Sequence, residues 1–235
     1  DTAFHKLADR VNVVYAVDKD EKKAKEFADK FGCAYATDFE QIADKDIDVL
    51  HICLPHYLHA PMAMKAMRAG MNVLTEKPVA MTLQEADLMK QVQKETGKKL
   101  GVIFQTRYTT GVQRLKKMIE EGTFGKIISA RSMLTWSRTE DYYKSSDWKG
   151  TWDGEGGGTL IDQAIHSMDR VRYLVGSDIA WIEGNVSNYT HPYVKVEDTA
   201  TAVIGFENGC IYSVYATNTY SIDAPIDIEL VGEKG

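Results

Sequence analysis

The chain has 235 residues, of which 44% are hydrophobic and 26% are charged, the balance of a globular protein with one large domain or two modest ones. Its net charge of −6 and its pI near 5.6 argue against a broad nucleic-acid-binding surface. No apolar run approaches the roughly 18 residues that a membrane-spanning helix needs. The three cysteines lie far apart without a CxxC pair, so we expect a reducing, cytoplasmic environment.

Strand and helix patterns alternate strictly through the first 105 residues. The predicted strands are 10–17, 47–55, 71–75 and 100–105, and the predicted helices are 20–32, 60–70 and 83–97. The run at 47–55 is almost wholly apolar, as is typical of a parallel strand that is covered on both faces. Such alternation predicts right-handed crossovers and a doubly wound, parallel Rossmann-type sheet.

Both ends of this pattern lack a part. A dinucleotide-binding unit runs strand, GxGxxG, helix, strand and then an acid. Here Asp18 follows the strand at 10–17, but no glycine-rich turn precedes it, and 2–8 reads as the end of the helix that should follow that turn. We therefore expect the first strand and the glycine-rich loop to lie before residue 1. The segment 227–235 reads as a strand without a returning partner, so we expect the chain to be cut at both ends.

The second half has the pattern of an α+β domain. We predict helices at 112–122 and 159–176, a strand at 126–136, a loop at 137–158 and a β-hairpin at 199–217 that turns at Asn208-Gly209. These elements predict a helix-covered antiparallel sheet. The domains are then 1–105, a partial dinucleotide-binding domain, and 106–235, a partial substrate and oligomerisation domain. Alternating apolar residues along 199–217 suggest a homo-oligomer formed through this sheet.

Two groups of residues have the chemistry of a catalytic site. Asp162 and His166 stand four apart on a predicted helix and share one face, so the carboxylate can orient the ring as a general acid/base, although a surface ion pair has the same spacing. The glycine run at 153–158 lies just before them and favours a functional role, because glycine permits close backbone approach. Glu76, Lys77 and Pro78 end the predicted strand 71–75, where a doubly wound sheet binds its ligands.

Joined in this order, the segments resemble the Gfo/Idh/MocA family of NAD(P)-dependent sugar and cyclitol oxidoreductases. The matching stretches cover nearly the whole chain: AVDKD, IDVLHICLPHYLHAPMAMKAMRAGMNVLTEKPVAMT, RYTTGVQRLKKMIEEGTFGKI, GGGTLIDQAIHSMDRVRYLVG and VEDTATAVIGFENG. The combination of EKP with a glycine run and D-x-x-x-H some 85 residues later is a specific signal, whereas EKP alone is weak.

The resemblance implies roles for particular residues. Lys77, Asp162 and His166 match the catalytic and substrate-binding positions, with His166 as the acid/base and Lys77 beside the reacting hydroxyl. Asp18 would bind the adenosine ribose, which favours NAD, although the neighbouring Lys19 also permits NADP. Further cofactor-binding positions are Leu54, Pro55, His59, Glu76, Lys77 and Gln105, and weaker substrate-binding candidates are Arg107 and Trp148.

The expected function is hydride transfer between NAD(P) and a secondary hydroxyl of a sugar, sugar derivative or cyclitol. One alternative is an NAD-dependent glycosidase of the same family, and another is a sugar- or dinucleotide-sensing regulator without catalysis. We expect a small polyol or sugar as the partner, and neither nucleic acid nor membrane. A zinc site at His51, His56 and His59 is not expected, because no cysteine or carboxylate completes the ligand set.

Overall fold

The computed structural model describes residues 2–235. The first half contains α1 (Thr2–Lys6), β1 (Tyr15–Val17), α2 (Glu21–Phe31), β2 (Ala34–Ala36), η1 (Phe39–Gln41), β3 (Val49–Ile52), α3 (His56–Arg68), β4 (Asn72–Thr75), α4 (Leu83–Thr96) and β5 (Leu100–Val102). The second half contains η2 (Gln105–Tyr108), α5 (Thr110–Glu120), β6 (Ile127–Thr135), α6 (Glu140–Lys144), α7 (Trp152–Glu155), η3 (Leu160–Ala164), α8 (Ile165–Val175), β7 (Ile179–Ser187), β8 (Thr199–Phe206), β9 (Ile211–Thr217) and β10 (Asp227–Gly232).

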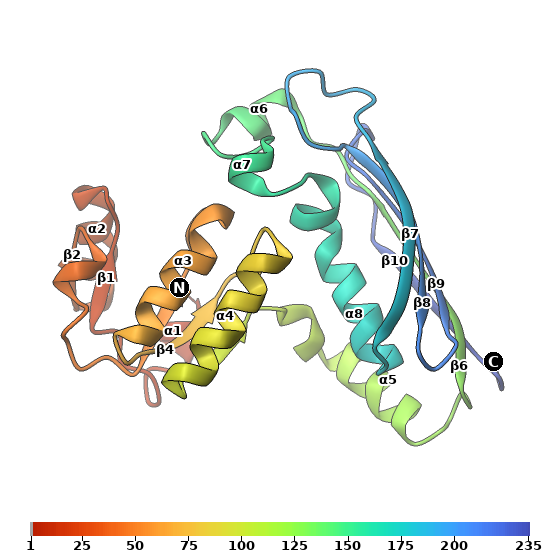
Figure 1. Cartoon of the computed structure of the whole chain (residues 1–235), viewed down its shortest axis with the longest axis horizontal. Helices are drawn as coiled ribbons and strands as arrows, with labels where there is room; N and C mark the ends of the chain where they lie inside the picture. The colour runs from red at the N-terminus through yellow and green to blue at the C-terminus, as the bar shows by residue number, and fades with distance from the viewer. Residues whose placement is uncertain (1) are drawn as a thin grey trace.

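The first half has the predicted parallel architecture of a Rossmann-type fold, but its strands form two sheets. β1 pairs with β2, and β3, β4 and β5 form a second sheet, with every pair parallel. In Figure 1 the β1–β2 pair and α2 lie at one end of the molecule, and α3 and α4 lie beside β4. The expectation that strand 47–55 is covered on both faces was wrong. β3 presents Val49, which is 49% exposed, and His51 on an open face.

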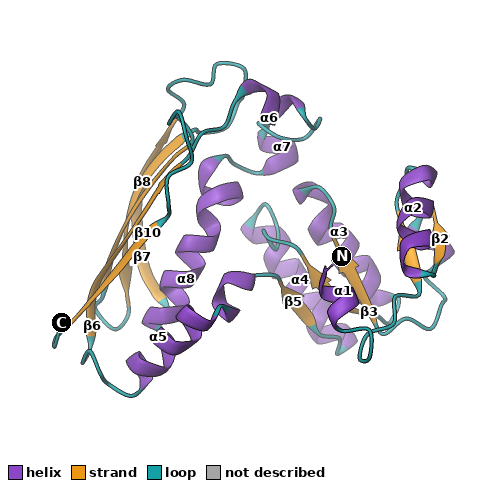
Figure 2. Ribbon diagram, turned by 180° about the vertical axis from the view of Figure 1, so that it is seen from behind, coloured by secondary structure: helices purple, strands orange, loops and turns teal. Residues whose placement is uncertain are grey.

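The second half folds into a five-stranded sheet with helices on one face, as Figure 2 shows. The strand order is β10-β6-β9-β8-β7. Val171 and Val175 of α8 pack in one buried cluster with Ile204, Tyr212 and Val214 of the sheet. The predicted helix-covered sheet is confirmed, but it is mixed rather than purely antiparallel, because β6 and β9 run parallel. Parallel neighbours need a long crossover, and the segment with η3 and α8 provides it.

Several local predictions differ from the structure for identifiable reasons. α3 begins at His56, four residues before the predicted start, so Pro61 lies inside the helix rather than in its first turn. The predicted loop 137–158 contains the short helices α6 and α7. β2 and β7 were not predicted, since β2 has three residues and β7 is exposed along nearly its whole length and shows no apolar alternation. The strand predicted at 10–17 is ordered as a strand only at 15–17.

Within residues 2–235, no helix combines the length and the apolar character needed to cross a bilayer.

The glycine run lets the backbone approach closely at the start of η3. Gly156 has a φ of 83°, which is in the left-handed region, and a Cβ on Gly158 would lie 1.9 Å from the Glu197 carbonyl oxygen. The Glu197 carboxylate accepts hydrogen bonds from Gly158 N at 2.7 Å and from Leu160 N at 3.1 Å. A carboxylate in this position satisfies amides that have no partner within the first helical turn. Glu197 therefore fixes the segment that carries Asp162.

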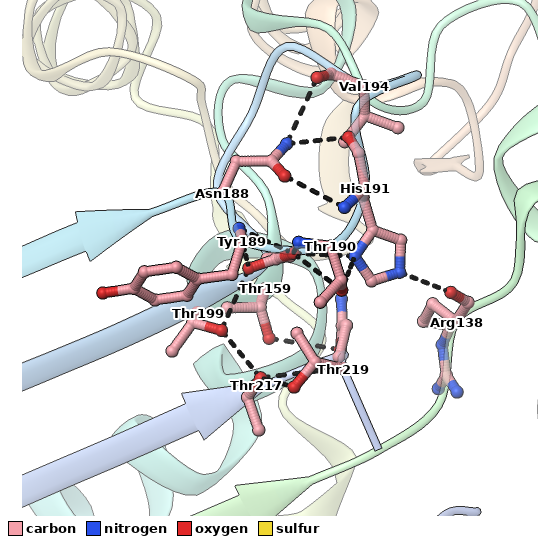
Figure 3. A network of polar contacts seen from close by, with 12 residues as sticks. Arg138, Thr159, Asn188, Tyr189, Thr190, His191, Val194, Thr199, Thr217 and Thr219 are labelled. Carbon is pink, nitrogen blue, oxygen red and sulfur yellow. Dashed lines mark hydrogen bonds and ion pairs between the residues drawn. The ribbon is translucent and has the colours of Figure 1, made fainter. Parts of the chain in front are cut away.

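The residue after Glu197 anchors a different loop, 188–198, from the interior. The buried Asp198 carboxylate accepts hydrogen bonds from the backbone of Tyr189 and Thr190 and from the Thr199 hydroxyl, and it lies 2.8 Å from His191 Nδ1. Burial alone would raise the pKa of Asp198, but these hydrogen bonds lower it overall. Figure 3 shows the surrounding network, in which His191 Nε2 lies 2.7 Å from the Arg138 carbonyl oxygen.

Substituting Asp198→Asn is expected to lower the free energy of unfolding by about 2–4 kcal/mol, because an amide cannot accept all of these buried donors. Urea titration followed by circular dichroism measures the loss. Asp223→Asn is the matched control, since that carboxylate is 52% exposed although it also binds an arginine, Arg138. The control should change the unfolding free energy by less than about 1 kcal/mol. Equal effects of the two substitutions would contradict the anchoring role of Asp198.

Candidate active site

Lys77 lies where the strands of the β3–β4–β5 sheet end. Ile52 accepts a hydrogen bond from Glu76 N at 2.9 Å, which aligns the ends of β3 and β4, and the Lys77–Pro78 peptide bond is cis. Lys77 Nζ donates to the Asp162 backbone carbonyl at 2.7 Å and to its Oδ1 at 2.8 Å. The two side chains are only 16% and 11% exposed. The structure thus joins two residues 85 positions apart, one from each half of the chain.

The second carboxylate oxygen of Asp162 is also occupied. Tyr142 OH and Gln163 Nε2 each donate to Oδ2 at 2.6 Å. Burial alone would raise the pKa of Asp162, but the charge and hydrogen bond of Lys77 and the Tyr142 hydroxyl lower it. Burial also raises the pKa of Tyr142, and the Asp162 charge adds to the effect. Asp162 is therefore an ionised carboxylate, and the protonated Tyr142 hydroxyl donates a hydrogen bond to it.

The predicted orientation of His166 by Asp162 is not what the structure has. Within the described residues, no hydrogen bond or ion pair joins the two side chains, because the Asp162 oxygens are taken by Lys77, Tyr142 and Gln163. Asp162 also lies in η3, which is a π-helical turn rather than part of an α-helix. His166 Nδ1 is buried without a hydrogen-bond partner. Burial, followed by the positive charge of Lys77, lowers the pKa of His166.

His56 lies beside the Lys77–Asp162 pair, and Trp148 lies beside His56. His56 Nε2 lies 3.8 Å from Asp162 Oδ1, and its ring centroid is 4.7 Å from that of Trp148. His56 Nδ1 donates to the Glu155 carbonyl oxygen at 2.8 Å, which ties α3 to α7. Trp148, a predicted substrate-binding residue, thus packs beside His56.

The residues predicted to line the cofactor cleft beside β3 fall into two groups. Leu54 and Pro55 are half-buried at the strand end, with Pro55 capping α3. His59 is 0% exposed, and its ring nitrogens lie 2.7 Å from the carbonyl oxygens of Pro78 and Leu54. The structure therefore corrects the prediction of His59 as a cofactor contact. It bridges the loops after β3 and β4 and positions Lys77 from the interior.

The remaining predicted residues are spread along the molecule. Glu76 is half-buried and accepts a hydrogen bond from Lys77 N at 3.3 Å, and Gln105 is exposed at the start of η2. Asp18 follows β1, and its Oδ1 accepts a hydrogen bond from Asp20 N at 2.9 Å. Arg107 forms an ion pair with Asp169 of α8, with Nε donating to Oδ2 at 2.8 Å. That pair lines a cavity of about 270 Å³ against the large sheet, and no contact joins Arg107 to Lys77 or Asp162 within residues 2–235.

Three residues that contact Asp162 were not predicted as site residues. His56 carried a signal, because it follows the end of a parallel strand, but it was considered only as a metal ligand. Tyr142 and Gln163 carried none, since Tyr142 lies in a region without periodicity. Among the described residues, no cluster of three or more His, Cys, Asp or Glu side chains is suited to hold a metal ion.

Several of the described residues are suited to bind NAD, but the glycine-rich loop of an NAD site is not among them. Asp18, Leu54, Glu76 and Gln105 follow the carboxyl ends of β1, β3, β4 and β5, which is where open α/β sheets bind ligands. Asp18 is a partly exposed carboxylate that can accept hydrogen bonds from ribose hydroxyls. Residues 2–235 contain no GxGxxG loop to cradle the pyrophosphate.

Comparisons with known proteins agree with this geometry. Residues 2–104 match the oxidoreductase family with an NAD-binding Rossmann fold, and residues 112–235 match the GFO/IDH/MocA C-terminal domain. Levoglucosan dehydrogenase of Pseudarthrobacter phenanthrenivorans is 34% identical over 90% of this chain and 60% of its own length. Myo-inositol 2-dehydrogenase of Thermotoga maritima is 26% identical over 95% of this chain and 66% of its own length.

A solved structure is similar over almost the whole chain. The WlbA dehydrogenase of Bordetella pertussis, in complex with NADH and UDP-GlcNAcA, superposes with a TM-score of 0.92 and 27% identity, covering 99% of this chain and 67% of that one. The chain thus spans 60% to 67% of the length of these three relatives. Since family models match both halves, the resemblance seen in the sequence is confirmed. The chain, whose first half is an NAD-binding Rossmann fold, belongs to the Gfo/Idh/MocA family of oxidoreductases.

Proposed function

We propose that the protein is an oxidoreductase that transfers a hydride between NAD(P) and a secondary hydroxyl of a sugar, sugar derivative or cyclitol. The observation that carries this proposal is the Lys77–Asp162 pair, joined at 2.8 Å across the two halves of the chain. It lies at the carboxyl end of the parallel sheet, and His166 is near enough for the Lys77 charge to lower its pKa. A hydrogen-bond donor, a carboxylate and a neutral imidazole are suited to alcohol oxidation, in which the oxygen loses its proton as the hydride leaves the carbon.

In the proposed reaction, Lys77 Nζ donates a hydrogen bond to the substrate oxygen and stabilises the negative charge that develops there. Asp162 holds the ammonium in place. The hydroxyl proton passes to His166 through Nε2, because Nδ1 is sealed in the interior. NAD, when bound, supplies the acceptor for the hydride that leaves the carbon. Asp18, Leu54, Pro55, Glu76 and Gln105 are proposed to hold the cofactor, with NAD favoured over NADP by Asp18.

The substrate class is supported by the relatives. Their names specify levoglucosan, myo-inositol and D-xylose. The test is a panel of these three compounds with NAD and NADP, in which NADH formation and product are measured separately. We expect at least one polyol to yield one carbonyl product per NADH. Release of free sugar without net NADH would instead favour the glycosidase. The absence of both turnover and NADH binding would contradict an oxidoreductase.

We further propose that the protein is a homo-oligomer formed through the outer face of the large sheet. Cross-strand register places Trp181, Val203, Ile211 and Met133 on the face opposite α8. These four side chains are 44%, 39%, 40% and 41% exposed. The cross-strand row through Val203 also holds Glu183, Ser213 and Arg131, so apolar side chains on this face alternate with polar and charged ones, as at many subunit interfaces.

Light scattering tests the oligomer. Val203→Glu, on this face, should convert the oligomer into monomers, since the new charge would be buried in the interface beside that of Glu183. Leu83→Glu is the matched control, because Leu83 is 82% exposed on α4, away from this sheet, and should leave the mass unchanged. A wild-type protein that is monomeric at micromolar concentration would remove the proposal.

The domain boundary and the cellular location are also proposals. We place a domain boundary near residue 106, giving domains 1–105 and 106–235, and the family matches at 2–104 and 112–235 support it. We propose a cytoplasmic location, supported by Cys33, Cys53 and Cys210, which are free thiols. Cell fractionation with an antibody against the protein tests the location.

A further inference from the structure

His56 has a fixed tautomer inside the candidate site. His56 is the first residue of α3 and is 4% exposed, and its ring lies against that of Trp148 at an interplanar angle of 50°. Nδ1 lies 2.8 Å from the Glu155 carbonyl oxygen, and a carbonyl oxygen can only accept a hydrogen bond. Nδ1 therefore carries the hydrogen. In the neutral ring, Nε2 then has a lone pair and must act as an acceptor.

That acceptor points toward Asp162 without a donor. Nε2 lies 3.8 Å from Asp162 Oδ1, which is longer than the roughly 3.2 Å limit of a hydrogen bond. No hydrogen bond to Nε2 occurs elsewhere in residues 2–235. An acceptor left open beside a reactive pair is suited to a ligand that brings a hydroxyl donor.

The ring is also neutral under ordinary conditions. Burial lowers the pKa of His56 to about 4, and the nearby Lys77 charge contributes. The carboxylate of Asp162, paired with Lys77, acts in the opposite direction. An uncharged acceptor favours a hydroxyl donor over a carboxylate or phosphate, which would bring a second acceptor to the same place.

We propose that His56 is a specificity-determining residue that accepts, at Nε2, a hydrogen bond from the substrate hydroxyl next to the one oxidised. The inference rests on the proposed function, because Lys77 and Asp162 must hold the reacting hydroxyl. His56 Nε2 lies 3.8 Å from the Asp162 Oδ1 that binds Lys77 Nζ, so a hydroxyl next to the one held by Lys77 comes within reach of Nε2. The site therefore selects vicinal diols over isolated alcohols.

The test compares substrates as well as variants. The panel compound with the highest kcat/KM and its two monodeoxy analogues, each lacking one hydroxyl adjacent to the oxidised carbon, are assayed with NAD. The wild type should prefer the parent over one analogue by about 10–100-fold. His56→Phe, which keeps a ring against Trp148, should lower kcat/KM for the parent by about the same factor and leave that analogue within about threefold.

Two further variants exclude a purely structural effect. His56→Gln retains an acceptor and should recover part of the preference, and His51→Phe, the same change on the exposed face of β3, should leave it intact. Equal losses of parent and analogue in His56→Phe, or an unchanged preference, would overturn the role of His56. A wild type that oxidises no compound of the panel would instead contradict the proposed function.

Discussion

Replacing Lys77 with methionine is expected to lower kcat by roughly 10²–10⁴-fold while NADH still binds. The ammonium donates to both oxygens that Asp162 offers it, at 2.7 and 2.8 Å, and no second lysine contacts Asp162 within residues 2–235. Methionine keeps the length of the side chain but cannot donate to a developing alkoxide. Steady-state kinetics and NADH fluorescence measure the two effects on one sample.

The same substitution leaves the Asp162 carboxylate without its partner, so stability must be followed in parallel. Breaking a buried pair on one side costs about 3–5 kcal/mol. Lys77→Arg keeps the charge, yet it should also lose most turnover, because a planar guanidinium does not replace an ammonium at one fixed point. Lys65→Met, on an exposed part of α3, is the matched control and should keep wild-type kcat. A Lys77→Met protein that is folded and nearly as active as the wild type would refute the role of Lys77.

Glu155 is expected to make stability fall as the pH rises. Burial raises the pKa of its carboxyl from 4.5 to about 8, although Gly150 N donates to Oε2 at 2.6 Å. Between these two values the folded protein holds a proton that the unfolded chain has released. The free energy of unfolding therefore decreases from about pH 4.5 to pH 8, by at most about 5 kcal/mol, and is constant in this respect above pH 8.

Glu155→Gln isolates this contribution, because the amide oxygen can still accept from Gly150 N and does not ionise. Denaturant titrations at a series of pH values should give a smaller decrease for the variant, and above pH 8 the variant should be the more stable protein. Glu140→Gln, an exposed glutamate of the neighbouring α6, should follow the wild type. Curves of wild type and Glu155→Gln that run parallel over the whole range would show that Glu155 does not titrate as inferred.

The sequence was sufficient for the features that depend on local pattern. Two helices are examples: helices were predicted at 20–32 and 83–97, and α2 and α4 occupy Glu21–Phe31 and Leu83–Thr96. The strands with apolar runs and the Asn208-Gly209 hairpin are local in the same sense. The family-specific spacing of Lys77 and Asp162 also brought together two residues that no periodicity connects.

The features that were missed depend on the surroundings of each residue. Spacing predicted a contact between Asp162 and His166, but the π-helical turn and the competing donors Lys77 and Tyr142 give the carboxylate other partners. β7 shows no apolar alternation because so little of it is covered. The family resemblance placed His59 in the cofactor cleft, yet the first turn of α3 rotates it into the interior. None of these outcomes is encoded in one segment alone.

The most direct measurement is a crystal structure of the protein grown with NADH and the best substrate of the panel. We expect the reacting hydroxyl to lie within about 3.2 Å of Lys77 Nζ, with His166 and Asp162 around it and the neighbouring hydroxyl at His56 Nε2. A polyol bound instead in the cavity beside Arg107 and Asp169, with the Lys77–Asp162 pair untouched, would contradict it.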